Sequence, residues 1–314
     1  MDIHLRPFEK LSKHDVHLAG GKGASLGEMT QAGIPVPPGF VVLASAFDRF
    51  VQETEIGPDI EAQLKKVSYK DVNSVDRYSN VIRDIIHDER MPKDLQVGIL
   101  KEFKKLKVRL VAVRSSATAE DSSQASWAGE LETFLNTTEK TLLGKVKQCW
   151  SSLFTPRAIF YRHEKKMHKA KVSVAVVVEV MVQSEVSGIA FTVHPVTKDK
   201  NQMIIEAGFG LGEAIVSGQI TPDSYVLDKQ RLDLMDISVA EQSRGLFGKS
   251  AGGNAWKNLP KVVGGKQKLT GRQIQELAKI CLGIEKHYGF PCDIEWAFVK
   301  GKFYITQSRP ITTL

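Results

Sequence analysis

Cysteine is scarce in this sequence, and its spacing suits neither a disulfide framework nor a structural zinc site. The 314 residues include three cysteines, Cys149, Cys281 and Cys292, which lie far apart and form no CxxC pair. Disulfide-rich secreted domains and zinc modules need clustered cysteines. The cysteine content therefore favours a reducing, cytoplasmic location.

Long hydrophobic runs are also missing. The most apolar run, from about Val172 to Val182, contains Glu179 and is far shorter than the roughly 20 residues that a membrane-spanning helix needs. The N-terminal segment MDIHLRPFEK carries charges where a signal peptide would have its apolar core. We expect a soluble, cytoplasmic protein with no membrane partner.

The positive charge is modest and is not arranged for nucleic acid. Lys and Arg number 43 against 36 Asp and Glu, a formal net charge of +7. Basic residues gather in Lys101–Arg109 and His163–Lys171, without the interleaved aromatics that stack on bases. Such segments are typical of solvated helix faces, or of a positive field that attracts a polyanion such as ATP. We expect no nucleic-acid partner.

Helix and strand patterns are mixed without a regular βαβ rhythm. β-Branched runs at Val108–Val113 and Val172–Val182 predict strands, and a capping-box pattern at Thr270 introduces a helix over about 271–287. This mixture favours an α+β fold over a doubly wound sheet. The length is sufficient for two lobes, which we place at residues 1–180 and 181–314.

A glycine-rich turn near the N-terminus is a candidate phosphate site. Gly20-Gly21-Lys22-Gly23 precedes a helix that we expect from about Ala24 to Gln31. Glycines let the backbone approach an anion, the helix N-terminus offers N–H groups, and Lys22 adds a positive charge. The spacing is not that of a P-loop, and a plain helix-entry turn is the alternative.

Arg114 lies where an apolar strand ends and a small, polar stretch begins. A guanidinium there can bind two phosphate oxygens. The hydroxyl and N–H groups of residues 115–129 could then replace water around a triphosphate. The alternative is a surface loop in which Arg114 pairs with Glu120 or Asp121.

The end of the chain predicts a hairpin with a metal-binding face. A three-residue loop, Lys300-Gly301-Lys302, would place Glu295 opposite Gln307, with Arg309 on the same face. A carboxylate and an amide oxygen suit Mg²⁺. The core side of the strand would then carry Ile294, Trp296 and Phe298. A two-residue loop would instead pair Glu295 with Thr306, so that Glu295 would no longer share a face with Gln307 and Arg309. The other alternative is an ordinary polar cluster on an exposed face.

Two further segments have open interpretations. Residues 179–182 end a buried strand, so their backbone could bind an adenine edge or simply belong to the core. The glycine-dense loop Glu206–Glu213 opens a helix, and phosphate contact and tight packing explain it equally well.

Several stretches together match one known family. They are Gly20–Glu28 (GGKGASLGE), Ala112–Asp121 (AVRSSATAED), Ala125–Gly129 (ASWAG), Ser152–Ala158 (SLFTPRA), Glu206–Glu213 (EAGFGLGE), Asp293–Trp296 (DIEW) and Gln307–Pro310 (QSRP). On these motifs, from about residue 10 onward, the chain resembles the N-terminal domain of the pyruvate phosphate dikinase family, which includes phosphoenolpyruvate synthase and rifamycin phosphotransferase. Within the family, its motif sequences are most similar to those of phosphoenolpyruvate synthase.

This resemblance implies an ATP-grasp fold of two lobes with the ATP cleft between them. Lys22 and Arg114 would bind phosphates, and Gly129 and Thr133 would line the loop that covers them. The adenine hinge would consist of Glu179, Val180, Met181 and Val182, although relatives often have Gln at position 179. Glu295 and Gln307 would hold Mg²⁺, and Arg309 would act with Lys22 and Arg114 on the transferring phosphoryl group.

The resemblance also implies a phosphotransferase that needs further domains. Relatives pass a phosphoryl group from MgATP to a histidine on a swivelling domain, and another domain then uses it to convert pyruvate to phosphoenolpyruvate. None of the eight histidines here has the family's Thr-x-Gly-Gly-x-x-x-His setting. We therefore expect an incomplete enzyme whose histidine-bearing and pyruvate-binding partners act in cis or in trans. A rifamycin phosphotransferase domain and a nucleotide-binding module without activity remain alternatives.

Overall fold

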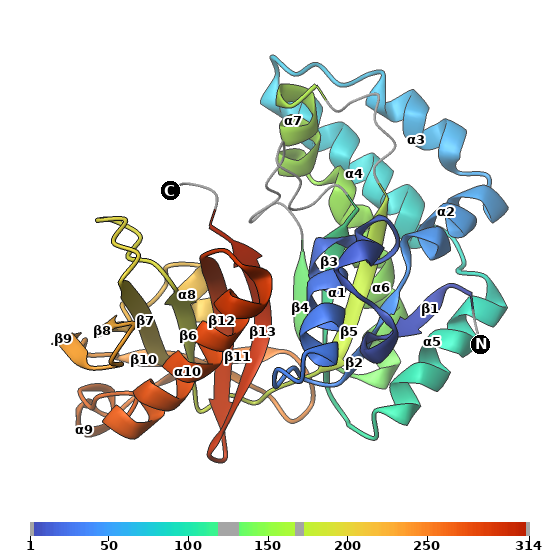
Figure 1. The fold of residues 1–314 in the computed structure, drawn as a ribbon. Coiled ribbons are helices and arrows are strands. Elements are labelled where there is room, and N and C mark those ends of the chain that lie inside the picture. The colour runs from blue at the N-terminus through green and yellow to red at the C-terminus, as the bar shows by residue number, and fades with distance from the viewer. Residues whose placement is uncertain (1–2, 119–131, 167–172, 312–314) are drawn as a thin grey trace. The chain divides into compact units, whose positions relative to one another are not determined.

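The computed structural model describes residues 3–118, 132–166 and 173–311, and these form two compact units (Figure 1). The first unit is Met1–Glu28 with Pro38–Val180, and the second is Met29–Pro37 with Met181–Leu314. The lobes predicted from sequence, 1–180 and 181–314, differ from these units only in the segment 29–37, which belongs to the second unit. That segment is tied to the second unit by a hydrogen bond from the Ile305 N–H to the Pro35 carbonyl oxygen, 2.8 Å long.

The first unit is built on a five-stranded antiparallel sheet in the order β1-β2-β5-β3-β4. Its strands are β1 (Leu5–Pro7), β2 (Gly39–Val42), β3 (Val111–Ala117), β4 (Thr133–Thr137) and β5 (Val174–Val180). The central strand β5 has the sequence VAVVVEV and is buried up to its last residue. As its unbroken apolar pattern predicts, β5 is covered on both faces.

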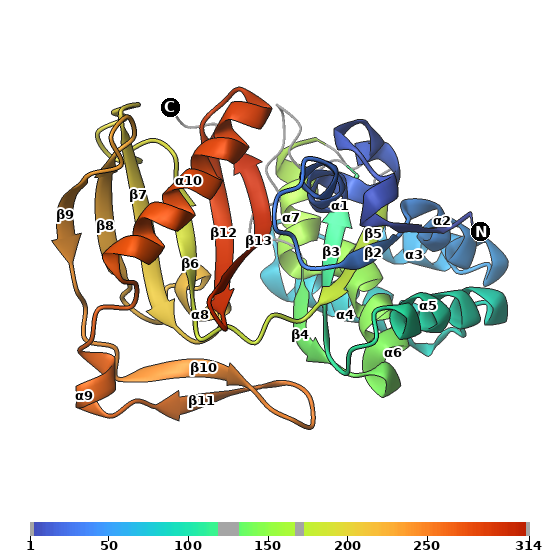
Figure 2. The same ribbon diagram turned by 60° about the horizontal axis from the view of Figure 1, so that its bottom comes forward.

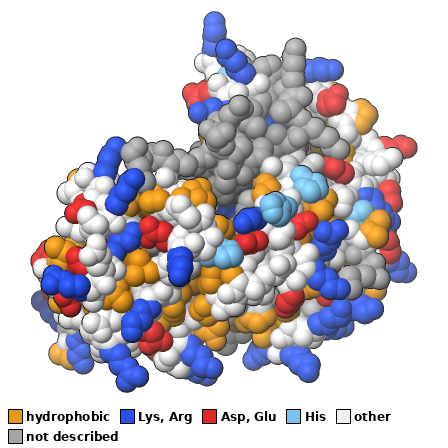
Figure 3. Space-filling model, viewed as in Figure 1, with side chains coloured by type: hydrophobic (Ala, Val, Ile, Leu, Met, Phe, Trp, Pro, Cys, Tyr) orange, Lys and Arg blue, Asp and Glu red, His pale blue; other side chains and the backbone are white. Residues whose placement is uncertain are grey.

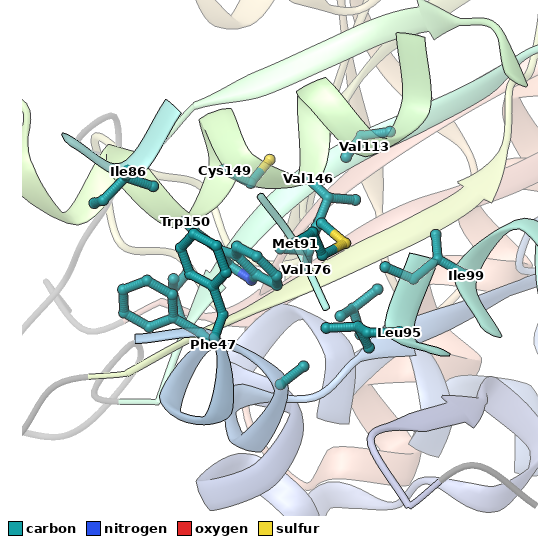
Figure 4. Close-up of a cluster of buried hydrophobic side chains, with 14 of the residues drawn as sticks. Phe47, Ile86, Met91, Leu95, Ile99, Val113, Val146, Cys149, Trp150 and Val176 are labelled. Carbon is teal, nitrogen blue, oxygen red and sulfur yellow. The ribbon is translucent and has the colours of Figure 1, made fainter. Parts of the chain in front are cut away.

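Helices cover one face of this sheet and form the main core of the unit (Figure 4). They are α2 (Ala44–Glu53), α3 (Gly57–Leu64), α4 (Val72–Asp88), α5 (Lys93–Lys105), α6 (Glu139–Ser151) and α7 (Pro156–Glu164), with short turns η1 (Phe8–Lys10), η2 (Lys13–Asp15) and η3 (Ser152–Phe154). Trp150 of α6 lies at the centre, with its ring stacked on Phe50 at 5.1 Å and close to Phe47 at 5.7 Å. Val113 and Val176 face this core from the sheet.

Helix α1 (Val16–Gln31) covers the opposite face, and it differs from the expected helix. We predicted a start near Ala24, whereas the helix begins at Val16 and is kinked at Gly20, with φ 68° and ψ 172°. A Cβ atom on Gly20 would lie 2.2 Å from Oγ of Ser116 on β3. Glycine is therefore required both by the backbone angle and by the close contact with the sheet.

The second unit contains a six-stranded antiparallel sheet in the order β13-β12-β6-β7-β8-β9, and a separate ribbon of β10 and β11. The strands are β6 (Val186–Phe191), β7 (Gln202–Phe209), β8 (Asp223–Asp228), β9 (Leu234–Ser238), β10 (Arg244–Gly248), β11 (Asn254–Asn258), β12 (Cys292–Val299) and β13 (Lys302–Pro310). The helices are α8 (Glu213–Val216), α9 (Lys261–Gly264) and α10 (Gly271–Tyr288). The mixture of helices and sheets without a βαβ rhythm is as predicted.

Helix α10 lies across one face of the larger sheet (Figure 2). Its start has the predicted capping box, formed by Thr270 and Gln273. Helix α10 packs against β12, and the buried Cys281 of the helix lies near the buried Cys292 at the start of that strand. Because alternate residues of a strand face opposite ways, the side chains of Asp293 and Glu295 point away from this helix.

A buried ionic cluster joins three segments of the second unit. Lys268 and Asp223 have fully buried side chains, and Nζ of Lys268 lies 2.8 Å from Oδ1 of Asp223. Oδ2 accepts hydrogen bonds from the Tyr225 hydroxyl at 2.7 Å and from the Lys268 N–H at 2.9 Å, and Oδ1 accepts one from the Ala240 N–H at 3.0 Å. These bonds tie the segments around Ala240 and Lys268 to β8.

The surface carries mixed charges. On the face in Figure 3, Lys and Arg side chains are spread among acidic and neutral ones rather than gathered in one stripe. None of the helices in the described part of the chain has the length and apolar character needed to cross a membrane.

The ionic cluster predicts a large loss of stability for Lys268→Met. Without Lys268, the buried Asp223 carboxylate loses its counter-ion, so we expect a loss of about 3–5 kcal/mol in the free energy of unfolding. Urea denaturation measures it, and the exposed Lys266→Met is the matched control. A loss below about 1 kcal/mol, the level of an exposed pair, would contradict this account.

The kink in α1 predicts that Gly20→Ala is more destabilising than Gly33→Ala. Both glycines have positive φ, 68° and 73°, but a Cβ atom on Gly33 would meet nothing within 4 Å. We expect a loss of about 1 kcal/mol for Gly33→Ala, from backbone strain alone. Gly20→Ala should lose at least about 3 kcal/mol, because it combines strain with a clash at Ser116. Equal losses in denaturation experiments would show that the contact with Ser116 is unimportant.

Candidate functional site

In the first unit, one face of the sheet carries three of the predicted nucleotide-binding residues. Arg114 of β3 is paired in register with Thr133 of β4, and Ala112 is paired with Glu179 of β5. Cross-strand partners share a face, and so do residues two apart on one strand. Arg114, Thr133 and Glu179 therefore lie on the same face.

Arg114 forms a buried ion pair with Glu179. Nη1 of Arg114 lies 3.1 Å from Oε1 of Glu179, and the side chains are only 8% and 3% exposed. The alternative partners considered from sequence, Glu120 and Asp121, lie outside the described residues. No local pattern indicates the observed pairing, because the two residues are 65 positions apart.

Lys22 belongs to the helix that packs on this face. The Gly23 N–H donates a hydrogen bond to Oγ of Ser116 at 3.2 Å, and Ser116 is two residues from Arg114 on β3. Lys22 is half-buried in α1, directly before Gly23. The fold thus places the helix of Lys22 over the face that carries Arg114, whereas Gly129 lies outside the described residues.

The proposed adenine hinge falls at the boundary between the two units. Glu179 and Val180 belong to the first unit, and Met181 and Val182 belong to the second. The Val180 N–H donates to the Pro38 carbonyl oxygen at 2.8 Å, and the Val182 carbonyl oxygen accepts from the Ser184 N–H at 3.0 Å. These two backbone groups already have protein partners.

In the second unit, the predicted loop of the final hairpin is wrong by one residue. Val299 pairs with Lys302, which leaves a two-residue loop of Lys300 and Gly301. Both loop residues have positive φ, 50° and 76°. This backbone suits the right-handed twist of the flanking strands, which explains why the shorter loop is preferred.

A β-bulge restores the pairing that the shorter loop would otherwise remove. The register shifts between Trp296, which pairs with Ile305, and Glu295, which pairs with Gln307. Thr306 is the extra residue, and its hydroxyl donates to the Glu295 carbonyl oxygen at 3.3 Å. Glu295 and Gln307 therefore lie opposite each other as predicted, although for a different reason. The predicted core residues of the strand, Ile294, Trp296 and Phe298, are buried.

Asp293 is a residue that the sequence interpretation missed. It pairs in register with Arg309, and its Oδ2 accepts from Nε of Arg309 at 2.9 Å and lies 2.8 Å from Nη2. A single carboxylate oxygen thus holds two nitrogens of the guanidinium. The alternation Asp293-Ile294-Glu295 would have indicated a second carboxylate on this face.

Glu206 of β7 shares the face as well. Ile189 of β6 is paired with both Glu295 and Glu206, so all three lie on one row across the sheet. Burial raises the pKa of the Glu206 carboxyl, and the nearby Asp293 charge raises it further. This face therefore carries the carboxyl groups of Glu206, Asp293 and Glu295 together with the guanidinium of Arg309.

The donor chemistry of the hairpin fits a hard divalent cation that also binds other oxygens. Over residues 3–118, 132–166 and 173–311, no three His, Cys, Asp or Glu side chains are arranged to hold a metal ion by themselves. Glu295 and Gln307 offer one carboxylate and one amide oxygen in register. Mg²⁺ is commonly held in this way, by one or two protein oxygens, with waters and substrate phosphates completing its shell.

Comparisons with known proteins agree on one family. The family model described as "Pyruvate phosphate dikinase, AMP/ATP-binding domain" matches residues 16–314. Probable phosphoenolpyruvate synthases of Methanothermobacter thermautotrophicus and Archaeoglobus fulgidus are 45% and 47% identical to the chain, over 98% and 97% of it. Rifampicin phosphotransferase of Bacillus subtilis is 38% identical over 98% of the chain.

The chain spans less than half the length of these relatives. It covers 46% and 41% of the two synthases and 36% of the rifampicin phosphotransferase. The family match, in contrast, extends over nearly all of the chain and includes each motif of the two faces. The chain therefore belongs to the pyruvate phosphate dikinase AMP/ATP-binding domain family.

Proposed function

We propose that this chain binds MgATP and activates it for phosphoryl transfer in a phosphoenolpyruvate synthase-like enzyme. The two units would act as the two lobes of an ATP-grasp site. Lys22 and Arg114 of the first unit would bind phosphates, and the β12–β13 hairpin of the second would hold the metal and the reacting phosphoryl group. The observation that carries this proposal is the register of the hairpin, which puts Glu295, Gln307 and Arg309 on one face.

Each residue of the hairpin would have a separate task. Glu295 and Gln307 would supply oxygen ligands from neighbouring strands. When bound, Mg²⁺ would supply positive charge that offsets the negative charge developing on the phosphoryl group during transfer. Arg309, fixed by Asp293, would present its guanidinium to the moving phosphoryl group without a large loss of side-chain entropy on binding.

The phosphoryl acceptor would be a histidine on a further domain, supplied in cis or in trans. No histidine of this chain has the family's acceptor setting. In the full enzyme, the phosphohistidine would convert pyruvate to phosphoenolpyruvate in the cytoplasm. Rifampicin phosphotransferase is the second candidate, because the Bacillus subtilis relative is similar over almost the whole chain.

Arg309→Ala should abolish transfer while leaving nucleotide binding measurable. We expect the rate of label transfer from ATP to a histidine-bearing partner domain to fall about 100-fold or more, because a fixed cation at the transferring group is lost. Lys302→Ala, an exposed position on the same strand, is the control and should retain the wild-type rate. Retained transfer in Arg309→Ala would remove Arg309 from the catalytic set.

Metal dependence separates an active domain from an inactive nucleotide-binding module. We expect isothermal titration calorimetry to show ATP affinity about tenfold or more higher with Mg²⁺ than without it, because the ion joins the phosphates to protein ligands. Glu295→Gln should remove most of that difference. Binding that is indifferent to Mg²⁺ in the wild-type chain would contradict the proposal.

A further inference from the structure

The buried partner of Arg114 is unexpected for a phosphate-binding cation. A carboxylate within hydrogen-bonding distance repels the anion that Arg114 is proposed to bind. The pair is also deeply buried, with side-chain exposures of 8% and 3%. Two charges withdrawn from water in this way are costly unless their geometry is well satisfied, so the position of Glu179 calls for a functional explanation.

Small residues flank Glu179 on both neighbouring strands. Its partners on the two neighbouring strands are Gly39 and Ala112, both small and buried. A Cβ atom on Gly39 would lie 2.6 Å from the Phe8 ring and from the Val178 carbonyl oxygen. Gly39 thus leaves room for the Phe8 ring, while Arg114 on β3 is diagonally adjacent to Glu179 and is its ion-pair partner.

This geometry differs from that of a side chain that recognises a base. Thr133, which was assigned to the loop that covers the phosphates, is the direct cross-strand partner of Arg114. Oε1 of Glu179 is bound to Nη1 of that same arginine. The carboxylate therefore belongs to the phosphate-facing group of side chains, although the backbone of residues 179–182 was assigned to the adenine edge.

We propose that Glu179 is a positioning residue that fixes the guanidinium of Arg114 for the triphosphate and does not read the base. This inference rests on the proposed function, because it assumes that Arg114 binds ATP phosphates. It assigns the side chain of Glu179 to the phosphate end of the nucleotide, whereas the hinge role would assign it to the adenine. The effect of Glu179 on binding should then depend on the phosphates and be independent of the base.

Two substitutions separate position from charge. Glu179→Asp keeps the charge but withdraws the oxygen from Nη1 by one methylene. Glu179→Gln keeps an acceptor oxygen at the same reach and removes the negative charge. If Glu179 holds Arg114 in place, the first change should weaken phosphate binding, whereas the second should not.

The experiment measures the dissociation constants of MgATP, MgGTP and magnesium tripolyphosphate by calorimetry. Tripolyphosphate is the decisive probe because it has phosphates but no base. For Glu179→Asp we expect all three constants to rise by a similar factor, about tenfold, as for a displaced binding group. For Glu179→Gln we expect all three to fall together, about twofold or more, because a like charge near the phosphates is gone.

The matched control is Glu53→Gln. Glu53 also pairs with an arginine of the first unit, Arg49, at 2.6 Å, but its side chain is 47% exposed. All three constants should be unchanged in this variant. Thermal unfolding without ligand checks that each variant is folded.

Several outcomes would overturn the inference. One is a change in the ATP dissociation constant of a Glu179 variant without a matching change for tripolyphosphate. Another is a changed ratio of ATP to GTP affinity. Either result would show that Glu179 recognises the base. The inference would also be overturned if Glu179→Asp left the dissociation constants unchanged, or if Glu179→Asp and Glu179→Gln raised them equally. If Glu179→Asp does not fold, Glu179→Gln decides: an equal fall for ATP and tripolyphosphate supports the inference, and any other pattern contradicts it. If the wild-type chain binds no nucleotide, the proposed function itself fails.

Discussion

The register of the β12–β13 ladder is the constraint on which the functional account depends. Side chains alternate along a strand, so a shift of one residue would turn Gln307 and Arg309 to the face occupied by Trp296. The bulge at Thr306 prevents that shift by adding one residue to β13. A carboxylate, an amide and a guanidinium are thereby kept on one face, while Ile294 and Trp296 of β12 are buried on the other face.

A second principle recurs in both units. Each contains a proposed phosphate-binding arginine that is held by a carboxylate of the same unit, Arg114 by Glu179 and Arg309 by Asp293. A fixed guanidinium loses little entropy when an anion arrives, which favours binding to the reacting geometry. The two pairs differ in burial, because Arg309 is 33% exposed and Arg114 is 8% exposed. Arg309 is thus the more accessible to a group that changes position during transfer.

Local patterns allowed much of the fold to be predicted from sequence. The buried strand around Val177, the capping box at Thr270 and the face that carries Glu295 and Gln307 all follow from periodicity and capping rules. The pairing of Glu295 with Gln307 was correct because two errors cancelled. The loop was predicted one residue too long, and the bulge, which has no clear sequence signal, adds that residue back.

The remaining features depend on contacts between distant segments. Helix α1 begins at Val16 and passes Ser116, almost a hundred residues later, at Gly20, and a helix pattern alone does not indicate this contact. The hinge assignment of Glu179 comes from its neighbours in sequence, and these do not indicate its ion pair with Arg114. Sequence patterns suggest candidate side chains for a site, but they do not indicate the partners that orient these side chains in the structure.

The most direct test of the central claim is a crystal structure of the chain with Mg²⁺ and a non-hydrolysable ATP analogue. The account predicts that the metal lies about 2.1 Å from a carboxylate oxygen of Glu295 and from the amide oxygen of Gln307, and that it also binds phosphate oxygens. The guanidinium groups of Arg114 and Arg309 should contact the same triphosphate. A metal bound elsewhere, or a triphosphate out of reach of the β12–β13 hairpin, would contradict it.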